Sequence, residues 1–221
     1  MNFRELKSLV RQGEHGRLEF KRKAAYPEKI IKEVVAFANT EGGELLIGVD
    51  DDGKIPGLKF AEEDKYVLDK AIARYCSPDI HYTTEIIPLN ESRSVIRYSI
   101  NKSPEGPHYV QEPGAPQRKV YVRVNDQSIQ ASREVRQVLK GEKKSREVRF
   151  SFGEKEKQLM EFLDKKGSIT VAQFAEIAGE PARKVSRTLV LLVLAGVLRI
   201  EPRTGQDLFM RKSEIPERTD R

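Results

Sequence analysis

Residues 45–49 constrain the fold of this chain more than any other stretch. They read Leu, Leu, Ile, Gly and Val, so an extended strand there has apolar side chains on both of its faces. Such a strand is covered on both sides, as in a sheet that has helices packed against it. Apolar residues at helical spacing over 28–39, followed by Gly42 and Gly43, predict a helix that ends just before this strand. The sequence therefore predicts a layered domain of the α/β or α+β class.

Further helices and strands are expected on both sides of this strand. Leu18 and Phe20 alternate with Glu19 and Lys21, which predicts a half-buried strand with the charged pair on one face. The other predicted elements are a short helix ending near Gly13, a helix at 66–75, strands at 83–88, 94–100 and 120–124, and a helix through Leu139 that Ser132 caps. We assign residues 1–141 to this first domain.

The composition changes after residue 139. Residues 140–147 are charged with little apolar content, and we interpret 142–152 as a linker. The next part, 153–213, predicts a helix, a short strand, a helix, a turn, a helix that begins at Pro181 and a hairpin with its tip at 202–205. This is the order of a winged helix-turn-helix, so we expect a second, smaller domain of that class. Residues 214–221 are polar and are expected to form a flexible tail.

Charge and cysteine content narrow the classes of partner. The chain has 40 Lys and Arg against 34 Asp and Glu, for a net charge of +6, and residues 142–221 hold 17 basic and 13 acidic residues. This moderate excess favours polyanionic partners such as nucleic acid. The single cysteine, Cys76, excludes an intramolecular disulfide and a Cys-rich zinc site. We find no signal segment and no apolar run near the ~20 residues that span a bilayer, and therefore expect a soluble cytoplasmic protein without a membrane partner.

The third helix of the second domain is the best candidate for reading nucleic acid. A recognition helix contacts bases through residues near its amino terminus. The residues expected to touch nucleic acid are Arg183, Lys184, Ser186 and Arg187 on this helix and Arg203 at the hairpin tip. The alternative is a protein-docking module, because winged helices also serve in that role and basic helix starts are common.

Acidic residues of the first domain are candidates for a metal site. Glu14 precedes the strand that carries Glu19 and Lys21, and Asp50 ends the central strand. Converging carboxylates could hold a divalent cation, and Lys21 could stabilise developing negative charge. The alternative is that alternating Glu and Lys mark a solvated strand face. Residues 50–53 predict a tight turn, because the twelfth position of a calcium loop would be Ala61 rather than Glu.

Several of these segments together resemble the Schlafen AlbA-like domain family. They are Glu14-x4-Glu19-Phe20-Lys21, Ala36-Phe37-Ala38-Asn39-Thr40-Glu41-Gly42-Gly43, Leu46-Ile47-Gly48-Val49-Asp50-Asp51, Gly57-Leu58 and the closing strand Val120-Tyr121-Val122-Arg123-Val124. The resemblance covers residues 8–140. It implies an AlbA-like core, which in bacteria and archaea is often joined to a winged helix in proteins described as DNA-binding regulators.

The resemblance also implies a possible enzymatic activity. In animal members the same core can be a metal-dependent endoribonuclease that cleaves transfer and ribosomal RNA. Carried over by position, the catalytic and metal-binding residues would be Glu14, Glu19 and either Asp50 or Asp51, with Lys21 beside them and Mg²⁺ or Mn²⁺ as the ion. The animal core has two lobes and a zinc site, whereas this chain has one lobe. A homodimer could supply the second lobe and form a basic groove.

We therefore predict a nucleic-acid-binding protein that resembles a DNA-binding transcriptional regulator, with DNA as the favoured target and structured RNA as the other. The alternative is a divalent-metal endoribonuclease that uses Glu14, Glu19 and Asp50.

Overall fold

The computed structural model describes residues 1–112, 114–143 and 152–212. The chain divides into two compact units, which we call unit 1 (Met1–Ala131) and unit 2 (Ser132–Arg221). Most of the expected linker, at 144–151, and the whole expected tail lie outside the described residues. No helix in the described ranges has both the length and the apolar character that crossing a bilayer requires.

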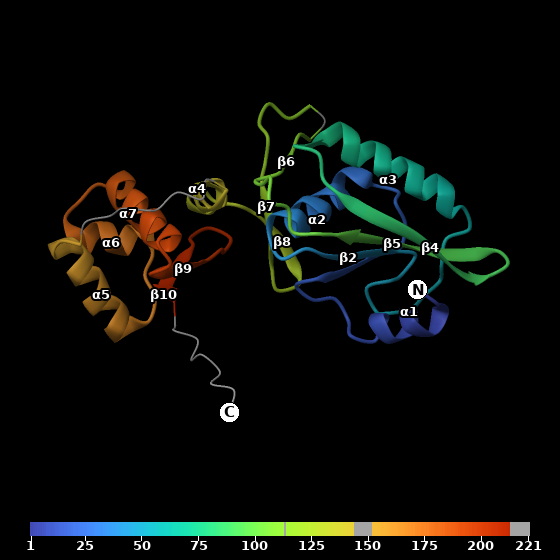
Figure 1. The fold of residues 1–221 in the computed structure, drawn as a ribbon, viewed down its shortest axis with the longest axis horizontal. Coiled ribbons are helices and arrows are strands. Elements are labelled where there is room, and N and C mark those ends of the chain that lie inside the picture. The colour runs from blue at the N-terminus through green and yellow to red at the C-terminus, as the bar shows by residue number, and fades with distance from the viewer. Residues whose placement is uncertain (113, 144–151, 213–221) are drawn as a thin grey trace. The chain divides into compact units, whose positions relative to one another are not determined.

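A four-stranded mixed sheet forms the centre of unit 1 (Figure 1). Its spatial order is β1 (Leu18–Lys21), β2 (Gly43–Ile47), β5 (Arg93–Ile100) and β4 (Tyr82–Asn90). β1 runs parallel to β2, and the other two pairs are antiparallel. The predicted central strand corresponds to β2, which has a neighbour on each side.

Helices cover both faces of this sheet (Figure 1). On one face, α2 (Pro27–Asn39) and α3 (Ala61–Tyr75) share a core with Ile47 of β2. On the other face, α1 (Phe3–Val10) shares a second core with Leu46. Successive strand residues point to opposite faces, so the continuous apolar run of β2 serves both cores.

Two glycines let α2 end close against the sheet. Gly42 has a φ of +72°, and a Cβ there would lie 2.7 Å from the carbonyl oxygen of Ile100. A Cβ on Gly43 would lie 2.5 Å from the ring of Phe37. Only glycine tolerates both the left-handed conformation and this close approach. The expected role of this pair therefore agrees with the structure.

A hairpin of β7 (Tyr121–Val124) and β8 (Gln127–Gln130) packs against α2. Asn39, the last residue of α2, donates its side-chain amide to the carbonyl oxygens of His108 and Tyr121, at 3.0 Å each. This buried amide fixes the start of β7 next to the end of α2. The remaining strands of unit 1 are β3 (Cys76–Ser77) and β6 (Tyr109–Val110), which pair with each other.

Unit 2 is a bundle of helices with a terminal hairpin. Its elements are α4 (Arg133–Glu142), α5 (Glu154–Lys166), α6 (Val171–Ala178), α7 (Ala182–Leu194), β9 (Leu198–Glu201) and β10 (Leu208–Arg211). Their core residues include Leu159, Phe174, Leu189 and Phe209. At the predicted strand 168–170, a single bridge joins Ile169 to Phe209. The order of helices and hairpin agrees with the sequence prediction.

The boundary between the units lies before α4, whereas the charged segment placed it after that helix. The helix itself was predicted, and its cap is Ser132, whose Oγ accepts from the backbone N–H of Val135 at 3.0 Å. It packs on α7 so closely that a Cβ on Gly141 would lie 2.4 Å from a methyl group of Leu194. This packing, which local sequence does not reveal, assigns α4 to unit 2.

Candidate functional site

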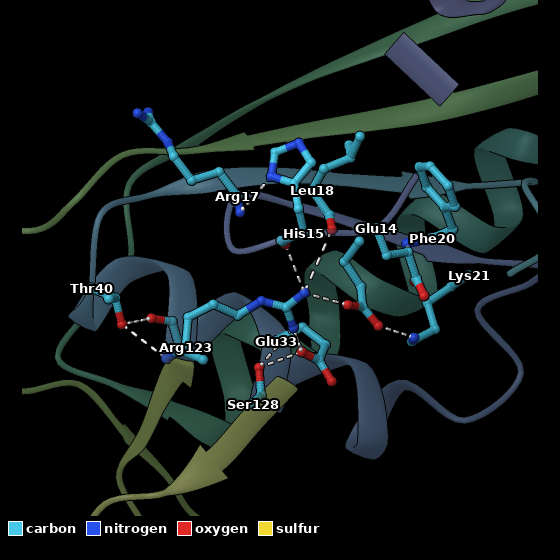
Figure 2. Close-up of polar contacts among 12 residues, drawn as sticks. Glu14, His15, Arg17, Leu18, Phe20, Lys21, Glu33, Thr40, Arg123 and Ser128 are labelled. Atoms are coloured by element: carbon cyan, nitrogen blue, oxygen red, sulfur yellow. Dashed lines mark hydrogen bonds and ion pairs between the residues drawn. The ribbon is translucent and has the colours of Figure 1, made fainter. Parts of the chain in front are cut away.

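A buried arginine ties together three elements of unit 1 (Figure 2). Arg123 lies on β7, and its side chain is only 2% exposed. Its Nη2 donates to Oε2 of Glu19 on β1 at 2.7 Å, and its Nη1 donates to Oε2 of Glu33 on α2 at 2.8 Å. Ser128 and Lys21 complete the group, as partners of Glu33 and Glu19 respectively. We call these five residues the Arg123 network.

Backbone and ring contacts complete the surroundings of the Arg123 guanidinium. Nη2 also donates to the carbonyl oxygens of His15 at 3.1 Å and Leu18 at 3.5 Å. Its central carbon lies 4.9 Å from the centre of the Phe37 ring. Nε is buried without a hydrogen-bond partner among the described residues. A charge this deeply buried is tolerated only where other groups compensate it, and two carboxylates do so here.

The prediction of a charged, half-exposed face on the first strand is wrong for Glu19. This residue is 5% exposed, and both of its carboxylate oxygens have cationic partners. Oε1 accepts from Lys21 Nζ, and Oε2 accepts from Arg123. The face is not solvated because the β7–β8 hairpin brings Arg123 into contact with it. Glu19 and Lys21 are next to each other, as expected from their spacing.

Charges within the Arg123 network shift the pKa values of Lys21 and Glu33. Burial alone would lower the pKa of the Lys21 ammonium, but the hydrogen bond and charge of Glu19 raise this pKa above its ordinary value. Burial, with the negative charge of Glu19, raises the pKa of the Glu33 carboxyl. The hydrogen bond from Ser128 and the charge of Arg123 oppose that rise.

Glu14 accepts a hydrogen bond from the backbone at the edge of the sheet. β1 is an edge strand, and Oε1 of Glu14 accepts the backbone N–H of Phe20 at 2.8 Å. Burial raises the pKa of the Glu14 carboxyl, opposed by this hydrogen bond, and the nearby charges of Glu19 and Asp51 raise it further. The structure thus places Glu14 within electrostatic reach of two other predicted carboxylates, but engages it with the backbone.

Asp50 and Asp51 begin the predicted tight turn. The N–H of Gly53 donates to the carbonyl oxygen of Asp50 at 2.8 Å, as in a β-turn. The Asp50 carboxylate lies 3.5 Å from Nε of Arg22, and Asp51 is exposed.

The predicted metal ligands do not fit a shared cation. Across residues 1–112, 114–143 and 152–212, no three His, Cys, Asp or Glu side chains are grouped so that they could hold a metal ion. Glu14 accepts a backbone N–H, Glu19 is paired twice, and Asp50 faces Arg22. A shared Mg²⁺ or Mn²⁺ would need these oxygens to converge on it.

The basic residues of α7 have different surroundings from the Arg123 network. Arg183 and Arg187 lie near the start of the helix and are exposed. In the described part of unit 2, neither guanidinium pairs with a carboxylate, although other basic residues there do. The first turn of α7 also lacks an acidic residue. Within the described ranges, two positive charges are therefore exposed and not paired with a carboxylate.

The other residues predicted to touch nucleic acid are engaged within unit 2. Ser186 is 3% exposed, and its hydroxyl is hydrogen-bonded to Oε1 of Glu134 on α4 at 2.5 Å. Lys184 pairs with Glu180 at 2.5 Å. Arg203 donates to Glu201 through Nε at 2.9 Å and Nη2 at 2.6 Å. Lys184 and Arg203 are exposed and can exchange these partners, whereas Ser186 is turned inward.

Sequence reasoning missed the role of Arg123. The segment Val122-Arg123-Val124 was read only as a closing strand. An arginine between valines on a short, otherwise apolar strand signals a buried charge that needs partners. Glu33 and Ser128 had no such signal, because their polar side chains are ordinary on a helix and a hairpin.

One family of known proteins matches most of unit 1. The family model described as Schlafen, AlbA_2 matches residues 14–132, more than half of the chain. The chain belongs to the Schlafen AlbA_2 family. The matched range contains β1, α2, β7 and β8, so the whole Arg123 network lies within the Schlafen AlbA_2 domain.

Two solved structures are similar to the chain. The N-terminal domain of a RecG-related protein from Nitrosomonas europaea is 20% identical, and the match covers 60% of this chain and 94% of that chain with a TM-score of 0.44. The DIP2311 protein from Corynebacterium diphtheriae is 13% identical, and the match covers 85% of this chain and 36% of that chain with a TM-score of 0.44.

Proposed function

We propose that this protein binds duplex DNA, as a transcriptional regulator would, and that unit 2 serves as a winged helix-turn-helix with α7 as its recognition helix. Membership of the Schlafen AlbA_2 family suggests nucleic-acid binding. The observation that carries the proposal is the pair Arg183 and Arg187 near the start of α7, which are exposed and have no carboxylate partner among the described residues.

The geometry favours DNA over double-stranded RNA. An α-helix fits the major groove of B-form DNA, which is about 12 Å wide. The major groove of A-form RNA is too deep and narrow for side chains to read. Arginine is also the side chain that most often contacts guanine edges, through a bidentate pair of hydrogen bonds. A helix with two exposed arginines at its amino-terminal end is therefore suited to duplex DNA.

Salt-dependent binding tests this proposal. Fluorescence anisotropy with a labelled mixed-sequence duplex should show binding that weakens steeply as salt rises, because counterions are released from the DNA. Replacing both Arg183 and Arg187 by Ala should weaken binding about tenfold or more and make the salt dependence shallower. Lys157→Ala is the control. Lys157 is an exposed cation on α5, so its replacement removes one positive charge, as the replacement of either arginine does. Equal binding by all variants would overturn the proposal and favour a protein-docking module.

The endoribonuclease alternative is tested separately. Transfer RNA incubated with the protein and Mg²⁺ or Mn²⁺ should remain intact, because Glu14, Glu19 and Asp50 are committed to other partners. Cleavage by the parent and not by Glu19→Gln would establish the enzyme instead, provided that the variant remains folded.

We also propose that the protein is a homodimer, as the family resemblance implies. The outer side of β4 pairs with no strand in the described residues, so its backbone groups can meet those of a second copy. Sedimentation equilibrium at several protein concentrations tests this, and a monomer mass at all of them would exclude the dimer.

A further inference from the structure

A basic groove runs between α4 and α7. It has a volume of about 320 Å³ and lies wholly within unit 2. Its lining residues are Arg133 and Gln137 from α4 and Arg183, Arg187, Val190 and Leu191 from α7. Three of these side chains are guanidiniums and none is a carboxylate. The groove is therefore suited to an anion.

The three arginines of the groove form no ion pair with the described residues. Like the two on α7, Arg133 is exposed, and it has no carboxylate partner in the described part of unit 2. Arg133 is the first residue of α4 and Arg183 the second of α7. A positive charge at a helix amino terminus is opposed by the helix dipole, so neither arginine stabilises its own helix. An external anion would relieve this repulsion as well as the mutual repulsion of the guanidiniums.

The position of Arg133 beside α7 is fixed by neighbouring contacts. Ser132, the cap of α4, hydrogen-bonds through Oγ to Oδ2 of Asp207 at 2.5 Å. One residue after Arg133, the Glu134 carboxylate hydrogen-bonds to Ser186 on α7. This hydrogen bond joins the first turn of α4 to α7. Ser186, which the sequence suggested as a DNA contact, is thus a positioning residue for α4.

We propose that Arg133 binds a backbone phosphate of the same DNA duplex whose major groove α7 enters. This inference rests on the proposed function and adds a contact from outside both the helix-turn-helix and the domain that the family model covers. Guanidinium groups bind phosphate oxygens through paired hydrogen bonds, which favours arginine at such a position. Leu191, 41% exposed at the groove, offers an apolar surface for the adjoining sugars.

Measuring the salt slope tests the role of Arg133. With the full chain and labelled duplexes of several unrelated sequences, Arg133→Ala should weaken binding about threefold to tenfold on every sequence. The slope of log affinity against log salt should become shallower by about 0.9, the value for one lost phosphate contact. Arg133→Lys should keep most of the slope, since the charge remains. Lys157→Ala should leave the slope unchanged.

A double-variant comparison tests the positioning role of Ser186. If the bond from Ser186 to Glu134 holds Arg133 in place, Ser186→Ala should reduce binding. Combining it with Arg133→Ala should then add little beyond Arg133→Ala alone. Far-UV circular dichroism of each variant confirms that the helices of unit 2 remain formed. A merely structural role for Ser186 would instead lower affinity equally with and without Arg133.

The outcomes distinguish failure of the Arg133 contact from failure of the proposed binding to duplex DNA. If the parent binds duplex DNA and loss of Arg183 and Arg187 weakens binding, but Arg133→Ala binds with the parent's affinity and slope, the role of Arg133 is overturned and the proposed function stands. If the folded parent binds no duplex DNA, both fail. Sequence-dependent losses in Arg133→Ala would show a base contact rather than a phosphate contact, and would also overturn the inference.

Discussion

Arg123 in unit 1 and Arg183 in unit 2 carry the same guanidinium in opposite surroundings. Arg123 is almost fully buried and has two carboxylates, a hydroxyl and two carbonyl oxygens around it. Arg183 is exposed and has no carboxylate partner in the described part of its unit. A charge whose partners are internal supports the fold, whereas a charge without them is available to a ligand. The surroundings of an arginine, more than its residue type, therefore decide whether its charge is compensated within the fold.

The largest expected effect comes from removing the buried arginine. Arg123→Met would leave the buried Glu19 and the partly buried Glu33 without the arginine between them, and we expect the free energy of unfolding to fall by about 3–5 kcal/mol. Arg183→Met should change it by less than about 0.5 kcal/mol, because that side chain is exposed.

Tyrosine fluorescence offers a probe for this measurement. The chain has no tryptophan, and all seven of its tyrosines lie in unit 1. Urea titrations followed in this way report the unfolding of unit 1 without a signal from unit 2. For the Arg183→Met control, far-UV circular dichroism follows the helices of unit 2. Equal losses in the two variants would break the comparison between the arginines.

A smaller effect is expected at Glu14. The structure makes it an acceptor for the backbone of β1, whereas the sequence suggested a charged metal ligand. Glu14→Ala removes the acceptor for the N–H of Phe20 at a sheet edge, and should cost about 1–3 kcal/mol. Glu14→Gln keeps an acceptor oxygen and removes repulsion from Glu19 and Asp51, so it should be neutral or stabilising near pH 7. Both values come from urea titrations of unit 1. A Glu14→Gln protein that loses as much stability as Glu14→Ala would show that the charge itself is needed.

The smallest effect is a pair of opposite pH dependences within unit 1. Folding raises the pKa of Glu33, so its contribution to stability is fully present below the unfolded pKa near 4.5 and is lost as pH rises through the folded pKa. Hydrogen bonds from Lys119 and Lys32 lower the pKa of Glu112 to about 2. Its contribution is therefore present above about 4.5 and is lost as pH falls toward 2.

Two variants separate these contributions between about pH 3 and pH 7. Over this range, the stability of the parent relative to Glu33→Gln should fall as pH rises, while its stability relative to Glu112→Gln should increase. Urea titrations at each pH, followed by tyrosine fluorescence, measure both differences. Parallel curves for the two variants would contradict the assignment.

Local patterns predicted most of the elements of both units. The apolar run at 45–49 identified β2 and the layers around it, because a strand apolar on both faces has few alternatives. Gly42 and Gly43 marked the end of α2, and Ser132 was expected to cap the helix that follows it, as it does. These features depend on residues close together in the chain.

The polar centre of unit 1 could not be predicted in the same way. Arg123 meets Glu19 across 104 positions of sequence and Glu33 across 90, and nothing local indicates which carboxylates it reaches. Ser186 illustrates the same limit in unit 2. Its place on a basic helix suggested a surface contact, but Ser186 is buried. Its hydroxyl is hydrogen-bonded to Glu134 of α4, which is 52 positions away in the sequence. Long-range packing decides whether such a residue faces solvent.

The reach of Arg123 also determines how the protein can be divided for experiments. A shortened version that stopped after β5 would retain β1, β2 and α2 but lose the cation between Glu19 and Glu33. Two acids would then face each other in a half-built interior, and such a piece should be recovered as insoluble or unfolded material. A cut between Ala131 and Ser132 keeps β7 with its acids and α4 with α7. We therefore expect a division at this position to disturb the described contacts of the two units less than a cut after β5.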